Sequence, residues 1–175
     1  ETKTDELKTF RLCDLNFNTE LVKINSDENF IVINADKVNT IISASGSHTT
    51  INSNAQFNQL CSTGSYAKIS STGSNNQIVS TGDFSSIISS GFENHIASTG
   101  SNAQIVSSGR LTEITSIGDD AHIITVGRDT FVNSNGNNAV IVCEGRGTKV
   151  KAKKGSLITL TEWWTPSPYR EENVH

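Results

Sequence analysis

One apolar side chain recurs every nine residues along most of this chain. Isoleucine, leucine or valine occupies the position fifteen times in one phase, from Ile24 to Val150. A small or short polar residue stands two positions before it, and a serine usually stands two positions after it. Because side chains two apart lie on the same face of a β-strand, each unit predicts a short strand with three inward-facing side chains.

Glycine ends most of the units. Ten glycines follow one another at a spacing of nine residues from Gly64 to Gly145, and Gly46 is the only one kept in the earlier repeats. The glycine with the two residues after it is expected to form a corner. We expect the glycine itself to take the positive φ that such a corner needs, since it has no Cβ. Two units of strand and corner would complete an 18-residue coil, and coils would stack about 4.8 Å apart.

The repeat therefore predicts an all-β fold, a two-sided β-solenoid (a β-roll or β-helix) of nine-residue repeats. Fifteen repeats correspond to about seven and a half coils and a rod of about 36 Å at the usual strand spacing. A three-sided left-handed helix also uses about 18 residues per coil, and it is the alternative. That fold would need an apolar position every six residues, whereas the period here is nine.

The composition agrees with a thin core. Only 34% of the residues are hydrophobic and 6% aromatic, and the formal net charge is -4. Inward-facing serines and asparagines can stack from coil to coil as hydrogen-bonded ladders, which offsets the scarcity of apolar surface. We therefore expect the chain to fold in spite of its low hydrophobicity.

The repeat also divides the chain. Residues 1–18 lack the nine-residue phase and are expected to form an N-terminal cap over the first coil, and residues 19–154 to form the solenoid. After Gly145 the glycine spacing slips to ten, and residues 155–175 are expected to form a C-terminal cap and tail. The apolar residues assigned to the two caps are Phe10, Leu12, Leu15, Phe17, Ile158, Leu160, Trp163 and Trp164, and Pro166 and Pro168 would end further strand pairing.

These repeats, of the type x-A/I-x-S/N-T-G-x-x-S/A, are followed by the segment GRGTKVKAKKGSLITLTEW at residues 145–163. Over residues 64–163 the chain resembles a group of bacterial and phage proteins of unknown function, whose tandem nonapeptides end in a similar segment. Members of that group carry an N-terminal domain with a G-F-x-A-C-E-like motif, which residues 1–45 do not match. The resemblance implies a solenoid and a bacterial or phage origin, and it implies no activity.

Candidate chemistry is sparse. The three cysteines, Cys13, Cys61 and Cys143, are odd in number and form no C-x-x-C pair, which indicates free thiols and neither a disulfide framework nor a zinc site. The calcium-binding nonapeptide G-G-x-G-x-D-x-U-x has a similar period, but its regular aspartates are missing here. His95 and Glu113 should be neighbours on adjacent coils, and we interpret them as an exposed cross-strand pair. We therefore predict no catalytic residues, no metal and no cofactor.

A basic ridge is the first candidate surface. The corner residues Arg110, Arg128 and Arg146 recur every 18 residues along one edge, and Lys149 and Lys151 follow them. Such cations can bind phosphate, carboxylate or an acidic protein surface. Asp83, Asp119 and Asp120 fall in the opposite corners, so the rod is expected to be laterally polarised. The sequence pI of about 5.5 argues against nucleic acid as the partner.

An aliphatic stripe is the second candidate surface. It would lie on the outer face of one sheet, where an open row of β-branched residues is unusual for a monomer. The tail with Trp163, Trp164 and Tyr169, a second copy of the chain or a different partner could cover it. The stripe consists of Ile88, Val106, Ile124 and Val142 at 18-residue spacing, with Val126 and Val140 beside them.

These features predict a non-catalytic interaction protein and not an enzyme: a rigid scaffold that binds a protein partner or itself. The alternative is a binder of ice or polysaccharide along the repeat face, suggested by Thr63, Thr72, Thr81 and Thr99. No apolar run approaches the roughly 18–20 residues that span a bilayer, so no membrane partner is expected. We expect a cytoplasmic protein of a bacterium or of a phage-infected cell, and a leader removed before Glu1 stays open.

Overall fold

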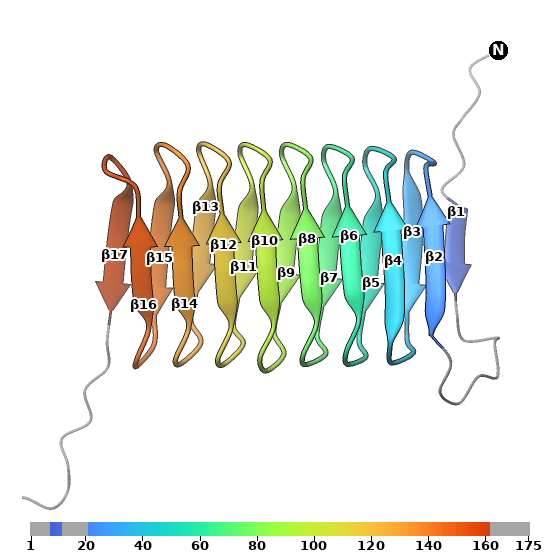
Figure 1. The fold of residues 1–175 in the computed structure, drawn as a ribbon, viewed down its shortest axis with the longest axis horizontal. Coiled ribbons are helices and arrows are strands. Elements are labelled where there is room, and N and C mark those ends of the chain that lie inside the picture. Colours follow the sequence, from blue (N-terminus) through green and yellow to red (C-terminus); the bar gives the residue numbers. More distant parts are fainter. Residues whose placement is uncertain (1–7, 12–20, 162–175) are drawn as a thin grey trace, which may run out of the picture.

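A computed structural model describes residues 8–11 and 21–161 of the chain. Its strands stack as a rod of coils in two facing sheets, with the chain passing from one sheet to the other at every corner (Figure 1). All pairings within both sheets are parallel, and partners from Val22 to Ala152 are 18 residues apart, as between Ile96 and Ile114. The predicted two-sided β-solenoid is therefore confirmed, and the three-sided alternative is excluded.

The odd-numbered strands form a nine-stranded sheet. They are β1 (Lys8–Arg11), β3 (Ile31–Ala35), β5 (Thr50–Ser53), β7 (Lys68–Ser71), β9 (Ser86–Ser89), β11 (Gln104–Ser107), β13 (His122–Thr125), β15 (Val140–Glu144) and β17 (Leu157–Thr161).

The even-numbered strands form an eight-stranded sheet. They are β2 (Val22–Ser26), β4 (Thr40–Ala44), β6 (Gln59–Ser62), β8 (Gln77–Ser80), β10 (His95–Ser98), β12 (Glu113–Ser116), β14 (Phe131–Ser134) and β16 (Lys149–Ala152). The described part of the chain contains no helix that is long and apolar enough to cross a membrane.

The core is a double row of aliphatic side chains contributed by the strands from β3 to β15. From Ile33 to Ile141 the repeated position is buried without exception, and burial alternates along each strand as the period of two requires. In the eight-stranded sheet, asparagines two residues before the buried aliphatic position form a ladder from coil to coil. The backbone N–H groups of Asn58 and Asn76 donate to the side-chain Oδ1 atoms of Asn76 and Asn94, both at 2.8 Å. The expected polar ladder is confirmed for these asparagines.

The serine columns are only partly hydrogen-bonded. Asn76 donates from Nδ2 to Ser71 Oγ at 2.7 Å, whereas the hydroxyls of Ser98 and Ser116 have no partner among the described residues. The difference follows from the residue five positions later. It is asparagine after Ser71, but alanine after Ser98 and Ser116.

The role predicted for the corner glycines is wrong. The positive φ angle belongs to the residue two positions after the glycine, as at Tyr66 (59°) and Leu111 (55°), and the first glycine with a left-handed φ is Gly145. The glycine is required for a different reason. A Cβ at Gly64 would collide with the backbone carbonyl oxygen of Gly46 on the preceding coil, so glycine is needed for the close approach of the two coils at this corner.

The ends differ in part from the predicted caps. β1 continues the nine-stranded sheet by pairing with β3, and residues 1–7 and 12–20 lie outside the described residues. At the other end β17 pairs with β15, so residues 157–161 are a strand of the solenoid. Ile158 of β17 pairs with Ile141, so these partners are 17 residues apart and not 18. Trp163, Trp164, Pro166 and Pro168 lie outside the described residues.

Candidate interaction surfaces

The aliphatic stripe lies on the outer face of the nine-stranded sheet. Strand pairing places Val106 between Ile88 and Ile124, and Ile124 next to Val142. Ile88, Val106 and Ile124 are 51%, 40% and 44% exposed, although each follows a fully buried isoleucine. The alternation of the strand therefore turns every second aliphatic side chain of β9, β11 and β13 to solvent.

The surroundings of the stripe on β9 and β11 are apolar or uncharged. Val126 is 51% exposed in the corner beside it, and Val140 is half-buried on β15. The other outward residues of β9 and β11 are Ser86 and Gln104, neither of which is charged. The stripe on β9 and β11 therefore has uncharged neighbours, whereas Lys68 on β7 and His122 on β13 are exposed on the flanking strands.

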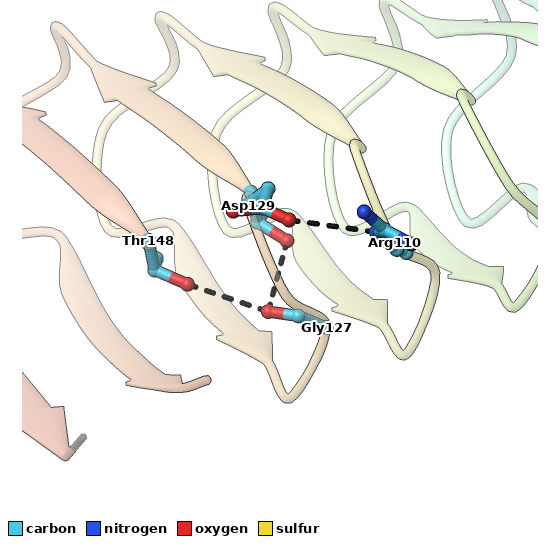
Figure 2. Close-up of polar contacts among 5 residues, drawn as sticks. Arg110, Gly127, Asp129 and Thr148 are labelled. Carbon is cyan, nitrogen blue, oxygen red and sulfur yellow. Dashed lines mark hydrogen bonds and ion pairs between the residues drawn. The ribbon is translucent and has the colours of Figure 1, made fainter. Parts of the chain in front are cut away.

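The arginines of the basic ridge occupy equivalent corners of successive coils. The N–H of Leu111 donates to the carbonyl of Arg128, and the N–H of Asp129 donates to the carbonyl of Arg146. Arg110 Nε lies 3.4 Å from Asp129 Oδ2, and Figure 2 shows the two side chains directed at one another. In the adjoining corner the hydroxyl of Thr148 donates to the carbonyl of Gly127. Lys149 and Lys151 lie around the corner on β16, exposed on the eight-stranded sheet.

The predicted lateral polarity is only partial. Asp83 and Asp119 lie in the corners opposite the arginines, where their Oδ1 atoms accept the N–H groups of Ser101 and Asn137, both at 2.7 Å. The backbone N–H and then the side chain of Asn137 lower the pKa of Asp119. However, Glu93 and Asp129 lie in the arginine corners and reduce the charge there.

His95 and Glu113 are neighbours across β10 and β12, as the sequence predicts. His95 Nδ1 lies 3.1 Å from Glu113 Oε2, and the side chains are 62% and 51% exposed. They line one wall of a groove of about 260 Å³ whose lining includes Val79, Ala97 and Thr115. An exposed pair of this kind contributes about 0.2–1 kcal/mol, and the geometry alone indicates no reaction.

The four threonines named in the sequence analysis lie directly after strands of both sheets. Thr63, Thr81 and Thr99 follow the strands of the eight-stranded sheet, whereas Thr72 follows β7 of the other sheet. The column beside the three threonines contains Cys61, Val79 and Ala97, so there is no second rank of threonine.

The two described cysteines are free thiols. Burial raises the pKa of the Cys61 thiol, and it raises the pKa of the Cys143 thiol to about 11.

Sequence reasoning missed an aromatic ladder. Phe30, His48, Tyr66 and Phe84 occupy the left-handed corner positions of four successive coils, and their rings stack with centroids 4.6, 4.9 and 5.1 Å apart. His48 therefore has stacking partners that the sequence interpretation did not identify. The 18-residue spacing of these rings could have revealed the ladder once the corners were aligned.

Comparison with known proteins gives no family for this chain, and the described side chains form no metal site. No family model, curated protein or solved structure matches the chain. Within residues 8–11 and 21–161, no three His, Cys, Asp or Glu side chains gather as a potential metal site.

Proposed function

We propose that this protein is a non-catalytic scaffold that associates with a second copy of itself through the aliphatic stripe. One observation carries the proposal: Ile88, Val106 and Ile124 lie side by side on the outer face of the nine-stranded sheet and are 40–51% exposed. Contiguous apolar surface of this kind marks interaction sites in soluble proteins.

A second copy fits the stripe because it presents the same surface. In a two-fold arrangement each isoleucine and valine of the stripe would meet another apolar side chain, and the stripe itself contains no charged residue. Packing of the stripe against the eight-stranded sheet of another copy would instead bury His95, Glu113 and Lys149. The face-to-face arrangement of nine-stranded sheets is therefore favoured.

The size of the face supports a weak dimer. If the whole nine-stranded face takes part, nine strands at about 4.8 Å and four residues at about 3.3 Å give roughly 570 Å² per copy, or about 1,100 Å² for the pair. This is just above the roughly 1,000 Å² expected for a specific interface, so we expect association that depends on protein concentration.

Charges placed in the stripe test the proposal. Val106→Glu combined with Ile124→Glu should keep the protein monomeric in light scattering at concentrations where the unchanged protein is dimeric. Ala97→Glu with Thr115→Glu is the matched control, because these residues hold the equivalent outward positions on β10 and β12. If the unchanged protein is monomeric and the stripe variant loses stability, the chain itself covers the stripe and the proposal fails.

The threonine column motivates the second candidate function, binding of ice or of a polysaccharide. Its support is a single rank formed by Thr63, Thr81 and Thr99. Thermal hysteresis and ice shaping at micromolar protein would establish ice binding. We expect neither, because the adjacent column of Cys61, Val79 and Ala97 lacks the hydroxyls of a two-dimensional array.

A further inference from the structure

The two sheets end unevenly at the C-terminal end of the solenoid. Among the described residues, β17 extends the nine-stranded sheet beyond β15, and β16 is the last strand of the eight-stranded sheet (Figure 1). Ile158 and Leu160 pair with the buried residues Ile141 and Cys143, so their side chains face inward. They are nevertheless 42% and 55% exposed, because in the described part of the chain no strand lies opposite β17.

The open edge of β16 can accept another strand. The N–H groups of Lys149 and Lys153 donate to carbonyls of the preceding coil, Thr130 and Ser134. Because parallel strands direct alternate residues to opposite sides, the backbone N–H and C=O groups of Val150 and Ala152 point toward the open edge. Within the described residues β16 has one neighbour only, which is β14.

The same strand is strongly basic on its outer face. Lys149 and Lys151 on β16, and Lys153 directly after it, alternate with inward residues and are exposed, at intervals of about 6.6 Å given the usual rise per residue. Arg146 adds charge at the adjoining corner, and residues 145–154 contain no acidic side chain. The outward residues of the neighbouring strand β14 are Phe131 and Asn133, which carry no charge. This charge is concentrated at the edge that is open.

We propose that β16 binds an extended segment of another protein in which acidic and aliphatic residues alternate, added as the next strand of the eight-stranded sheet. Its carboxylates would lie beside the three lysines, and its backbone would bond to Val150 and Ala152. Its aliphatic side chains would cover Ile158 and Leu160. The segment completes the coil that β17 begins, and this recognition by strand addition is separate from the self-association of the stripe.

Charge and hydrogen bonding argue against two competing occupants, a second copy of the chain and a nucleic acid. Lysines on an edge strand repel the same edge of a second copy, which is a common protection against uncontrolled sheet extension. The N-terminal edge strand β2 would place Lys23 beside Lys149 if solenoids stacked end to end in the register of the coils. A nucleic acid would pair with the lysines, but it has neither the backbone groups for Val150 and Ala152 nor aliphatic groups for Ile158.

A synthetic peptide provides the test. A capped, fluorescently labelled Glu-Val-Glu-Val-Glu peptide should bind the full chain in fluorescence anisotropy, and a Gln-Val-Gln-Val-Gln peptide should bind about tenfold more weakly or less. Lys149→Glu with Lys151→Glu should reduce affinity by about tenfold or more, because two attractive pairs become repulsive. Lys68→Glu, which reverses one lysine at an exposed strand position of the nine-stranded sheet, is a control for charge away from β16 and should change affinity less than about twofold.

Hydrogen exchange on the full chain separates the occupants. The amides of Val150 and Ala152 should exchange readily in the free protein and become protected when the acidic peptide is added. Protection already present in the free protein would show that another part of this chain occupies the edge, and would overturn the proposal. Equal binding of the acidic peptide to the charge-reversed variant, or no binding to the unchanged protein, would also overturn it.

Discussion

Replacement of Asn76 by alanine removes three hydrogen bonds from the buried interior. Its Oδ1 accepts the N–H of Asn58 at 2.8 Å, and its Nδ2 donates to Ser71 Oγ at 2.7 Å and to the Ala55 carbonyl at 3.0 Å. Alanine already stands at the equivalent inward position in several other repeats, as at Ala103, so steric conflict is not expected. The loss is therefore one of hydrogen bonding.

The magnitude follows from the groups left behind. A buried N–H without an acceptor costs about 1–3 kcal/mol, and each of the two other bonds contributes about 0.5–1.5 kcal/mol. We expect Asn76→Ala to lower the free energy of unfolding by about 3 kcal/mol. For a chain of this size that corresponds to a melting temperature lower by roughly 6–12 °C.

Ser98→Ala is the contrasting variant. Ser98 is equally buried, but its hydroxyl has no hydrogen-bond partner among the described residues, so its removal should be neutral or stabilising by up to about 1 kcal/mol. Thermal and urea unfolding followed by circular dichroism would measure both variants. Equal destabilisation by the two substitutions would refute the assignment of stability to the asparagine ladder.

Three further predictions concern the corners. Gly100→Ala should destabilise the solenoid severely, because its Cβ would meet the carbonyl oxygen of Gly82; an unchanged melting temperature would contradict the close stacking of coils. Leu111→Asn should raise stability by about 1 kcal/mol in urea unfolding, since asparagine tolerates the left-handed φ of 55° better than leucine; a loss would show that the leucine side chain is needed. Because folding lowers the pKa of Asp119 from its ordinary value of 3.8, the Asp119 carboxylate stabilises the fold at pH values above 3.8. This stabilisation is lost as the pH falls through the lower pKa of the folded state. Asp119→Asn should therefore make the free energy of unfolding depend less on pH at acid pH.

The architecture could be predicted because one physical requirement repeats. Each strand must bury one aliphatic side chain, and the fixed distance between these residues determines the number of residues per coil. The nine-residue spacing also predicted correctly that Val106 and Ile124 lie on an outer face, because inward and outward positions alternate along a strand. Pairing of His95 with Glu113 followed from the same spacing.

The corners and the ends could not be predicted in the same way. Glycine suggests positive φ, yet at Gly64 the decisive constraint is the approach of the preceding coil, which is a contact between residues 18 apart. Tyr66 takes the left-handed conformation against its intrinsic preference, with rings stacked on both sides of it. The open edge at β16 depends on where the last strand pairs, and the altered register of Ile158 is not evident from the glycine spacing.

Sedimentation velocity across a concentration series tests self-association most directly. The proposed stripe contact predicts a monomer of 18.8 kDa at low concentration and a species of twice that mass as the concentration rises. Val106→Glu with Ile124→Glu should remain at the monomer mass throughout, while Ala97→Glu with Thr115→Glu should follow the unchanged protein. A single monomeric species for the unchanged protein at all concentrations, or a dimer that persists in the stripe variant, would contradict the proposal.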